Sequence, residues 1–524
     1  MALLIFIGIY HLFTYNGLDF FDDLDYATYA YQLVNGEFAF TENIFSHRIG
    51  LFLPTAVAYF LFGVNDITTA ATAIVASVGT LIAIYCALKE NKSIAIVACY
   101  LLGLSYYFTV FFVKNYPDVV ITFVGIVSVM LIWKVPSSLK AQVGAAILFA
   151  GVVIWGVLSK ETILYFFPFY FMLLVHDVIK RQHMWFWIMA AISGLIFLAG
   201  YLYMYYFFTG DPFYRITAIE DGHYAATYSY FDKPFTALIP RLTYQPWYMF
   251  LGSEVAILMI LSIPVFSKLP WSNLRDTSTY FAILSIVLLL MFVFFTTSFR
   301  YYNPIGLFPR MYLMALPYWA ILAALGLEQL FLNRRVAILY CILFVVCTLV
   351  TFYTGNSNQS VIYLLLSVVF LMIILLNNYK LITRNTIKLG LLLVLLIHPV
   401  YSMTKGGYAN REEAYAVKTF LNSEEGKHIV VCDPRLYHGY TYYYSLQPKS
   451  NFIYIKYQDV PKTVDIEADD VYVLVNKFTE SKFASINKKF PGFTRVKPGW
   501  EIIFQSKDII LYRTSSLKDL LIYY

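Results

Sequence analysis

The chain has few charged residues for its length. Asp, Glu, Lys and Arg make up 13% of its 524 residues, whereas about 25% is usual for a soluble globular protein. Hydrophobic residues make up 60%, and the mean hydropathy is +0.64. These values exclude an ordinary soluble protein. They indicate a polytopic α-helical membrane protein with room for about a dozen spans and one soluble domain.

Cysteines are also scarce. Four of the five lie in apolar runs, and the fifth is Cys432. Their spacing matches neither a disulfide framework nor a metal-ligand motif. A glycine-rich phosphate loop and internal repeats are absent as well, and a net charge of +6 gives no sign of nucleic-acid binding. The sequence therefore predicts no metal site. It requires no cofactor, although the use of a divalent cation is an open alternative.

The apolar runs predict about thirteen transmembrane helices. The first run, 2–13, is about 18 Å long as a helix, which is short for a hydrocarbon core of roughly 30 Å. The run 49–62 is also short and is predicted to lie in the membrane interface. Twelve clearer spans are expected at 67–88, 93–112, 119–133, 143–159, 161–176, 185–208, 249–266, 279–297, 310–331, 336–353, 360–376 and 387–401.

The connections between these spans alternate in charge. One set carries at least two basic residues in each loop: 89–92, 134–140, 180–181, 268–275, 334–335 and 380–388. By the positive-inside rule this set is cytoplasmic. The other set then lies on the outer side, together with the chain after the last span. This set contains the loop 14–66 with its acidic stretch, 114–118, 159–161, 209–248, 298–310 and 354–360.

The composition changes near residue 402, where apolar runs shorten to strand length. Strands are expected at 429–433, 451–457, 471–476, 500–505 and 509–513, and helices at 411–422 and 478–490. We therefore predict a transmembrane domain, 1–401, followed by a small extracytoplasmic α/β domain, 402–524.

The stretch 19–27 is the main candidate site, because it places four carboxylates within seven residues next to an apolar run. Ionisable groups at a membrane suggest function, although a solvated acidic loop is the plain alternative. A carboxylate can take a proton from a hydroxyl. Basic residues, which are predicted on the same side, can hold a phosphate. Together they predict group transfer from a lipid phosphate.

Several motifs resemble those of a known family. They are Asp22-Asp23-Leu24-Asp25-Tyr26-Ala27, His47-Arg48-Ile49 before a helix ending in Phe62-Gly63, Lys114-Asn115-Tyr116-Pro117-Asp118, Leu158-Ser159-Lys160-Glu161, and Phe308-Pro309-Arg310-Met311-Tyr312. They are similar to motifs of polyprenyl-phosphate-sugar glycosyltransferases with the GT-C fold. The protein O-mannosyltransferases and the lipid A aminoarabinose transferases are the nearest of these. The specific motifs lie in residues 1–175, and the rest resembles the family in layout only.

The resemblance implies an inverting transfer of a sugar from a polyprenyl-phosphate donor to a hydroxyl of a lipid, glycan or protein acceptor. It also implies a bacterial inner-membrane protein with an extracytoplasmic active site. Asp22 would be the base, with Asp23 as the alternative, and Asp118 would be a second acid. The phosphate would be held by Arg48, Lys160 and Arg310. Arg48 stands where the family has Lys, and Asp23 stands where it has Glu. Further possible substrate contacts are His47, Tyr26, Glu161 and, in the long loop, Tyr224.

Each of these residues also has a plainer interpretation. Asp118 could cap the following helix, Lys160 and Glu161 could form an interfacial pair, and Arg310 could contact lipid head groups. Two other functions are alternatives to a glycosyltransferase. A lipid-linked glycan polymerase or ligase would rely on basic residues in an outer loop. A transporter of lipid-linked sugars would show charges within spans and an internal repeat.

Overall fold

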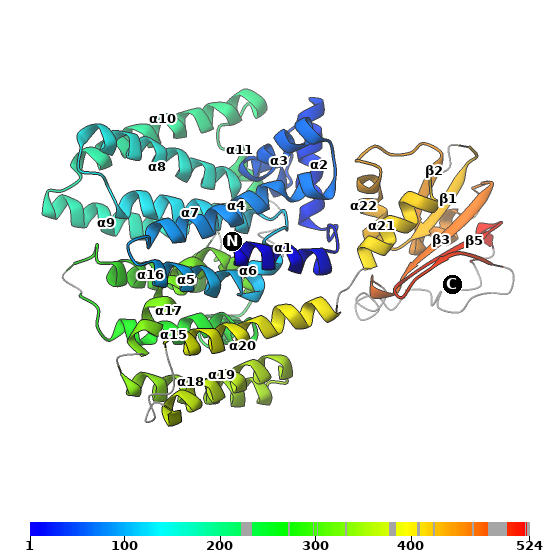
Figure 1. Cartoon of the computed structure of the whole chain (residues 1–524). Helices are drawn as coiled ribbons and strands as arrows, with labels where there is room; N and C mark the ends of the chain where they lie inside the picture. The colour runs from blue at the N-terminus through cyan, green and yellow to red at the C-terminus, as the bar shows by residue number, and fades with distance from the viewer. Residues whose placement is uncertain are drawn as a thin grey trace. The chain divides into compact units, whose positions relative to one another are not determined.

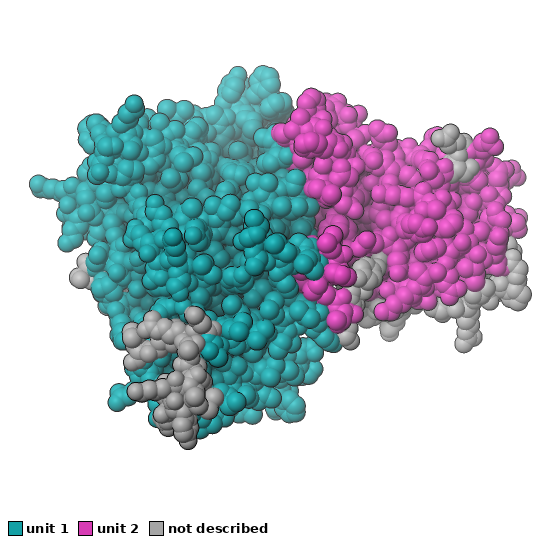
Figure 2. Space-filling view, viewed as in Figure 1, with its two compact units in different colours: residues 1–9, 38–54, 70–402 teal, residues 10–37, 55–69, 403–524 magenta. Residues whose placement is uncertain are grey.

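The computed structural model describes residues 1–221, 233–270, 273–296, 298–300, 302–330, 333–376, 384–405, 409–422, 425–463, 466–479, 500–518 and 520. The chain forms two compact units, shown in different colours in Figure 2. The first unit contains residues 1–9, 38–54 and 70–402, and the second contains 10–37, 55–69 and 403–524. The division predicted from the sequence, 1–401 and 402–524, stays a prediction. The units differ from it because they group 10–37 and 55–69 with the C-terminal residues.

The first unit is helical (Figure 1). Within the described ranges, nine helices are long and apolar enough to cross a membrane, or ten if one bent pair is counted. The nine are α4 (Asp66–Ala87), α8 (Leu139–Ser159), η2 with α9 (Glu161–Phe166 and Phe167–Lys180), α10 (Met184–Thr209), α16 (Thr277–Phe294), η4 with α17 (Pro309–Ala315 and Leu316–Leu330), α18 (Arg334–Tyr353), α19 (Ser357–Leu376) and α20 (Arg384–Lys405).

The bent pair replaces the predicted span 249–266. Residues Phe235–Gly252, which include α14 (Gln245–Gly252), meet α15 (Val255–Phe266) at 106°. The break lies at Glu254, whose φ of 64° is left-handed and rare for a residue with a side chain. The helix cannot continue through that conformation.

Three of the thirteen predicted spans form shorter helices. They are α1 (Ala2–Thr14), α7 (Pro117–Trp133) and α5 (Lys92–Gly103), which is followed by a separate helix, α6 (Tyr106–Phe111). The predicted span 93–112 is therefore interrupted after Gly103. The run 49–62 forms helix α3 (Ile49–Phe62). Its place in the membrane interface stays a prediction.

Polar caps fix the start of several of these helices. Ser138 accepts a hydrogen bond from the amide of Ala141 at the start of α8, and Asp276 accepts two at the start of α16. Such caps satisfy amides that have no partner inside the helix. They explain why the apolar runs begin as helices directly after polar connections.

Helix α17 lies in the centre of the first unit, and 89% of its span is buried. It packs closely against α15 because position 326 is glycine. A Cβ atom at Gly326 would lie 1.9 Å from the carbonyl oxygen of Leu261. The same carbonyl accepts a hydrogen bond from the Tyr340 hydroxyl of α18, at 2.7 Å. The glycine thus permits an approach that a larger residue would block.

The second unit contains a five-stranded mixed sheet, which is built from the five predicted strands (Figure 1). The strand order is β2 (Phe452–Lys456), β1 (His428–Cys432), β3 (Asp470–Asn476), β5 (Ile509–Thr514) and β4 (Glu501–Gln505). Strand β1 runs parallel to β2 and β3, and β5 runs antiparallel to β3 and β4. Helix α22 (Pro434–Tyr443) connects β1 to β2, and helix α21 (Ala409–Phe420) precedes β1.

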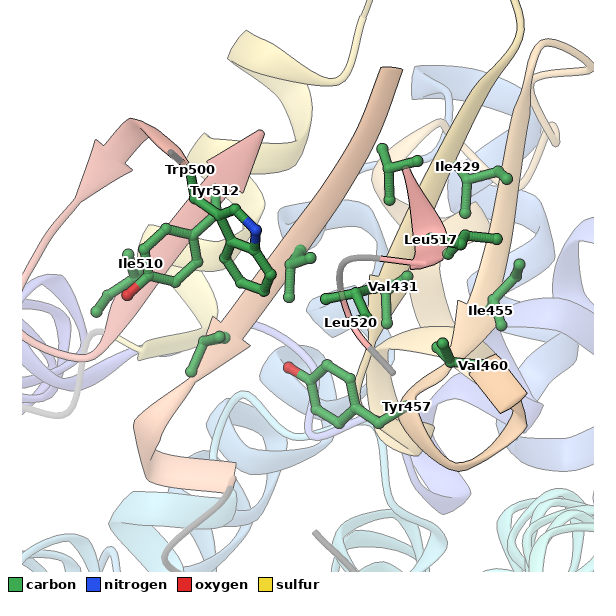
Figure 3. Packing of buried hydrophobic residues seen from close by; sticks show 13 residues of the cluster. Ile429, Val431, Ile455, Tyr457, Val460, Trp500, Ile510, Tyr512, Leu517 and Leu520 are labelled. Atoms are coloured by element: carbon green, nitrogen blue, oxygen red, sulfur yellow. The ribbon is translucent and has the colours of Figure 1, made fainter. Parts of the chain in front are cut away.

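Alternating residues of the strands form the core of this domain (Figure 3). Ile429 and Val431 of β1, with Val473 of β3, point to one face, as the two-residue period of a strand requires. The residues that cover this face include Tyr457, Val460, Trp500, Leu517 and Leu520. Most of the predicted helix 478–490 lies outside the described residues.

Candidate functional site

The acidic stretch forms the start of helix α2 (Asp22–Asn35), in the second unit. Asp22, Asp23 and Asp25 occupy its first turn, where the helix dipole favours negative charge. Asp23 is fully buried, and its carboxylate accepts hydrogen bonds from the amides of Asp19, Phe21 and Leu24 at 2.6, 2.9 and 3.0 Å. Asp23 therefore holds the turn that precedes the helix.

Asp22 and Asp25 have different surroundings from Asp23. Both are half-buried, and they lie three residues apart on one face of the helix. Burial, together with the charges of Asp22 and Asp23, raises the pKa of Asp25 to about 6. Tyr26, the next residue, is fully buried, so its ring packs α2 against the protein interior.

Two contacts fix this stretch to the C-terminal helices of the same unit. Asn410 of α21 donates from its side chain to the carbonyl of Leu18, and its own amide donates to the Asn16 side chain, both at 2.9 Å. The ring of Phe20 packs on Tyr443, with 5.1 Å between ring centroids. It also packs on Gly439, where a Cβ atom would lie 2.5 Å from Cγ of the ring. The C-terminal helices thus position the acidic turn.

In the first unit, Lys160 and Asp118 form a buried ion pair. The Lys160 Nζ lies 2.6 Å from Asp118 Oδ1 and 3.0 Å from the sulfur of Met311. Only 2% of Lys160 and 5% of Asp118 are exposed. The capping residue of α7 is Tyr116, without a side-chain hydrogen bond, so Asp118 does not serve as the cap.

Arg48 lies beside Glu161 in the same unit. Its Nη2 is 3.8 Å from Glu161 Oε1, and its guanidinium lies over the Phe45 ring, 5.1 Å from the ring centroid. Arg48 is also buried, with 3% exposed. The structure therefore brings the predicted pair Lys160–Glu161 into contact with two other predicted residues, Asp118 and Arg48.

Arg215 was not among the predicted site residues. It lies in helix α11 (Tyr214–Asp221), is 4% exposed, and donates from Nη1 to the carbonyl of Val157 at 2.5 Å. The charges of Arg48, Arg215 and Lys160 all act on the Glu161 carboxylate. No sequence motif marks Arg215, because the long loop that contains it shows no pattern that indicates burial.

A cavity of about 370 Å³ opens beside Arg215 and Glu161. Its other lining residues are mostly apolar: Val157, Ile163, Leu164, Tyr201, Ile216, Ile219, Phe295, Thr296, Ser298 and Phe299. An arginine and a glutamate at one edge of an apolar cavity suit a ligand with a charged head and an apolar chain.

His47 is held between two hydrogen-bond partners. One ring nitrogen lies 3.2 Å from the Tyr205 hydroxyl, and the other lies 2.9 Å from the carbonyl of Thr41. Burial and the charge of Arg215 lower the pKa of His47 to about 4. The imidazole is therefore neutral near pH 7 and orders the loop around it.

Arg310 stacks on Tyr116, with its guanidinium carbon 4.8 Å from the ring centroid. The charge of Arg310 also acts on Lys160, so Arg310 lies near the other charged residues of this site. Tyr224 lies outside the described residues.

Several buried polar atoms near these residues have no hydrogen-bond partner within the part of the chain that the structure describes. They include both side-chain polar atoms of Asn115, the hydroxyl of Thr162 and Oε2 of Glu161. Buried polar groups are rarely left unpaired in proteins, so these atoms suit contacts with a bound ligand. Among the described residues, no group of three His, Cys, Asp or Glu side chains could hold a metal ion.

No family model matches the chain, and no curated protein is similar to it in sequence. The structure of ArnT from Cupriavidus metallidurans in the apo state has a TM-score of 0.58 with this chain, at 13% identity over 98% of both chains. ArnT from the same organism bound to undecaprenyl phosphate gives a TM-score of 0.53, at 13% identity over 98% of this chain and 97% of that chain. ArnT is a lipid A aminoarabinose transferase with the GT-C fold. This chain is therefore a multi-pass membrane protein with the GT-C fold of ArnT, as its motifs predict.

Proposed function

We propose that the chain is a membrane glycosyltransferase that moves a sugar from a polyprenyl-phosphate donor to an acceptor hydroxyl. One observation carries this proposal: in a chain with the fold of ArnT, Arg215 and Glu161 line an apolar cavity, and the buried Arg48 and Lys160 also act on Glu161. The ArnT structure bound undecaprenyl phosphate, which is a polyprenyl phosphate.

The charges of this group favour an anionic ligand. The carboxylates that the described residues bring to Arg48, Lys160 and Arg215 include those of Asp118 and Glu161. These three cations and two carboxylates together carry one net positive charge, and burying a charge is costly. Guanidinium groups bind phosphate through directed, charge-assisted hydrogen bonds. The apolar walls of the cavity would take the polyprenyl chain.

The proposed reaction is an inverting displacement at C1 of the sugar. Asp22 takes the proton of the acceptor hydroxyl, and the hydroxyl oxygen forms a bond to C1. The bond from C1 to the phosphate oxygen breaks, and polyprenyl phosphate leaves with the electron pair. Arg48, Lys160, Arg215 and Arg310 would stabilise the charge on the departing phosphate. Asp118, paired with Lys160, would be the second acid and would fix the position of that lysine.

Asp22 suits the role of base better than Asp23. Asp23 already accepts three backbone hydrogen bonds, and such bonds favour the charged form of a carboxylate, which weakens it as a base. Asp25 lies beside Asp22 and would hold negative charge near it. We place the protein in the bacterial inner membrane with this chemistry on the extracytoplasmic side. The acceptor would be a lipid, a glycan or a protein.

The test is release of polyprenyl phosphate from a panel of polyprenyl-phosphate sugars by the purified protein, supplied with acceptors from a cell extract. The wild type should release polyprenyl phosphate with at least one donor. Asp22→Asn should lower the rate by about 100-fold or more, which is the scale of general-base catalysis. Asp211→Asn, in the long loop, is the matched control and should leave the rate unchanged. Equal rates for the wild type and Asp22→Asn would remove Asp22 as the base.

A second arm tests the phosphate contacts by binding of labelled undecaprenyl phosphate. Arg215→Gln should weaken binding by about 10-fold or more, because a hydrogen bond to a charged group contributes roughly 1.5–3 kcal/mol. Arg300→Gln is the control, since 56% of that side chain is exposed. Arg215→Lys keeps the charge and guards against misfolding. If all three variants bind like the wild type, the lipid phosphate does not occupy this cavity.

A further inference from the structure

The sheet of the second unit has a place where open α/β sheets commonly bind ligands. The chain leaves β1, passes through α22 and returns as β2 on one side of β1, whereas β3 lies on the other side. The strand order therefore reverses between β1 and β3. The crevice outside the carboxyl ends of strands at such a switch point is the usual ligand site of these sheets.

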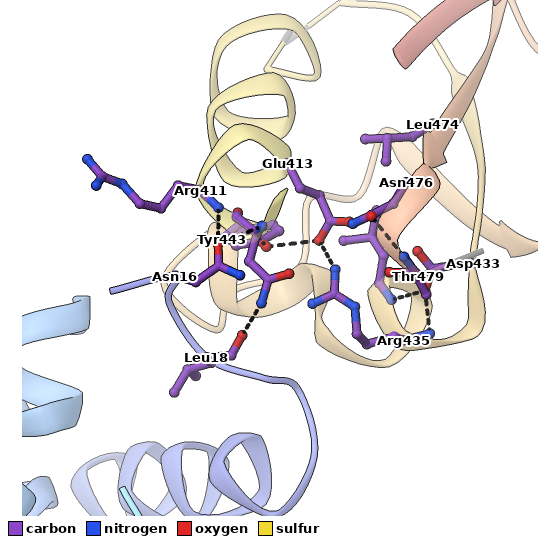
Figure 4. Close-up of polar contacts among 12 residues, drawn as sticks. Asn16, Leu18, Arg411, Glu413, Asp433, Arg435, Tyr443, Leu474, Asn476 and Thr479 are labelled. Atoms are coloured by element: carbon purple, nitrogen blue, oxygen red, sulfur yellow. Dashed lines mark hydrogen bonds and ion pairs between the residues drawn. The ribbon is translucent and has the colours of Figure 1, made fainter. Parts of the chain in front are cut away.

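Charged and polar residues occupy this switch point (Figure 4). Asp433 and Arg435 follow β1, and Asn476 ends β3. Arg435 donates from Nη2 to Glu413 Oε1 at 2.6 Å, and the other Glu413 oxygen accepts from Asn476 Nδ2 at 2.7 Å. Glu413 and Asp433 are fully buried, and only 8% of Arg435 is exposed.

Two donors of this network remain without a partner. Within the residues that the structure describes, Nε and Nη1 of Arg435 make no hydrogen bond. An arginine that is more than nine-tenths buried rarely leaves two N–H groups unpaired, because the loss of their hydration is costly. These donors thus point to a ligand with hydrogen-bond acceptors.

A cavity of about 190 Å³ lies beside Arg435, and we call it the switch-point cavity. Its other lining residues are Asn16, Asp19, Phe21, Asn410, Phe478 and Thr479. Polar groups that can bind hydroxyls therefore face the same space as two aromatic rings. The cavity is smaller than the pockets of about 300–1,000 Å³ that enclose drug-sized ligands, so it would take one unit of a larger molecule.

The charges of this cavity do not favour an anion. The positive charge of Arg435 is offset by Glu413 at 2.6 Å, and the carboxylates of Asp433 and Asp19 add further negative charge. A neutral ligand with many hydroxyl groups fits better, because its oxygens accept from Arg435 and its hydroxyls donate to the carboxylate and amide oxygens. A sugar ring also presents C–H groups to aromatic faces such as those of Phe21 and Phe478.

We propose that the switch-point cavity binds one sugar unit of a carbohydrate. This sugar unit would belong either to the acceptor glycan or to the lipid-linked donor. That assignment rests on the proposed function, whereas the binding of a sugar does not. The site would give the C-terminal domain a direct part in substrate recognition.

The test uses the full-length protein in detergent and a panel of methyl glycosides: hexoses, N-acetylhexosamines, pentoses and a hexuronate. Binding is measured by calorimetry. At least one neutral glycoside should bind, and Phe478→Ala should weaken its binding by about 10-fold. Thr479→Val should weaken it several-fold. Tyr415→Ala is the matched control, because Tyr415 is 55% exposed on α21 and does not line the cavity. Thermal melting of each variant checks its fold.

Competition experiments separate the sources and the alternatives. Displacement of the glycoside by a polyprenyl-phosphate sugar would assign the site to the donor, and displacement by an acceptor glycan alone would assign it to the acceptor. Binding that persists in a protein without transferase activity would leave this inference standing while the proposed function fails. No binding by any glycoside, equal binding by Phe478→Ala and the wild type, or occupation by inorganic phosphate instead would overturn it.

Discussion

At the residue scale, Asp22 and Asp23 are adjacent but have different tasks. Because Asp23 accepts three backbone hydrogen bonds and is fully buried, Asp23→Ala should remove the acceptor of three amides, of which that of Leu24 is buried. We expect this change to cost about 1–3 kcal/mol of stability and to lower the thermal midpoint. Asp22→Asn should lower the rate and change the midpoint less than Asp23→Ala does, because Asp22 is only half-buried and asparagine has nearly the same shape.

These two effects are measured by thermal melting in detergent beside the release assay. A normal midpoint for Asp23→Ala would show that the turn before α2 does not depend on this carboxylate. If Asp22→Asn instead lowered the midpoint as much as Asp23→Ala does, its loss of rate would not distinguish chemistry from folding.

Asp25 supplies a prediction on pH. Its pKa is raised to about 6 in the folded protein, against about 3.9 in an unfolded chain. The folded protein therefore binds this proton more tightly, and the contribution of Asp25 to stability is present below pH 4 and is lost as the pH rises through 6. Asp25→Asn removes the charge, so it should raise the thermal midpoint at pH 7.5 and have no effect near pH 4.

The measurement is a series of melting curves from pH 4 to pH 8 for the wild type, Asp25→Asn and the control Asp211→Asn. A difference between wild type and Asp25→Asn that does not change with pH would mean that titration of Asp25 is not its cause. The raised pKa is typical of functional sites, where charge is held at a cost to stability.

Sequence motifs named most of the charged residues that the structure brings together in the first unit, but not Arg215. Lys160 and Asp118 stand at the ends of predicted spans, where a single charge is conspicuous. Arg215 stands in a polar loop, where a charge is ordinary. Only its burial, with 4% exposed, distinguishes it, and burial depends on packing between distant segments.

At the element scale, the contact between Phe20 and α22 should determine the position of the acidic turn. A Cβ atom at Gly439 would lie 2.5 Å from Cγ of Phe20, an atom close to the backbone that cannot move aside easily. Gly439→Ala should therefore displace the ring, cost about 1–3 kcal/mol as overpacking usually does, and lower the transfer rate by moving Asp22.

Gly144→Ala is the matched control, because a Cβ atom at this helical glycine of α8 would meet nothing within 4 Å. It should not destabilise the protein, since alanine is the better helix former. Adding Phe20→Leu to Gly439→Ala should recover part of the loss in the thermal midpoint and in the rate. Additive effects of the two substitutions would contradict direct contact between these residues.

Local patterns predicted most helices and strands but not their interruptions. Hydropathy located the spans, and apolar runs of strand length located the strands of the C-terminal domain. The break after Gly103 and the bend at Glu254 were missed, because both lie in runs that remain apolar. A window average cannot register a single residue in a left-handed conformation such as Glu254, with φ of 64°.

At the scale of the whole molecule, sequence patterns could not predict which segments form the second unit. Asn16 and Asn410 form a hydrogen bond across 394 residues of chain. Neither residue has a neighbour in sequence that marks the contact. The acidic stretch that stood out in the sequence as a loop after the first apolar run thus belongs to the same compact unit as the C-terminal sheet.

The sidedness of the membrane gives the last prediction. Helix α7 has 17 residues, about 26 Å at 1.5 Å per residue, so Asp118 at its start and Ser137 just beyond its end lie at opposite ends. Lys160 pairs with Asp118 at 2.6 Å after α8 has returned along α7. The loop with Ser137 carries Lys134 and Lys140, so the positive-inside rule predicts that it lies in the cytoplasm. Asp118 and Lys160 should therefore lie on the outer side.

In a background without the five native cysteines, Ser137→Cys should react with a membrane-impermeant maleimide only after the cells are permeabilised. Asn358→Cys, an exposed position in the first turn of α19 within the stretch 354–360 that is predicted to be external, should react in intact cells. The reverse labelling would place Asp118 and Lys160 in the cytoplasm. Transfer from a donor on the outer side would then be excluded, whereas the helical fold and the sugar site proposed for the C-terminal domain would be unaffected.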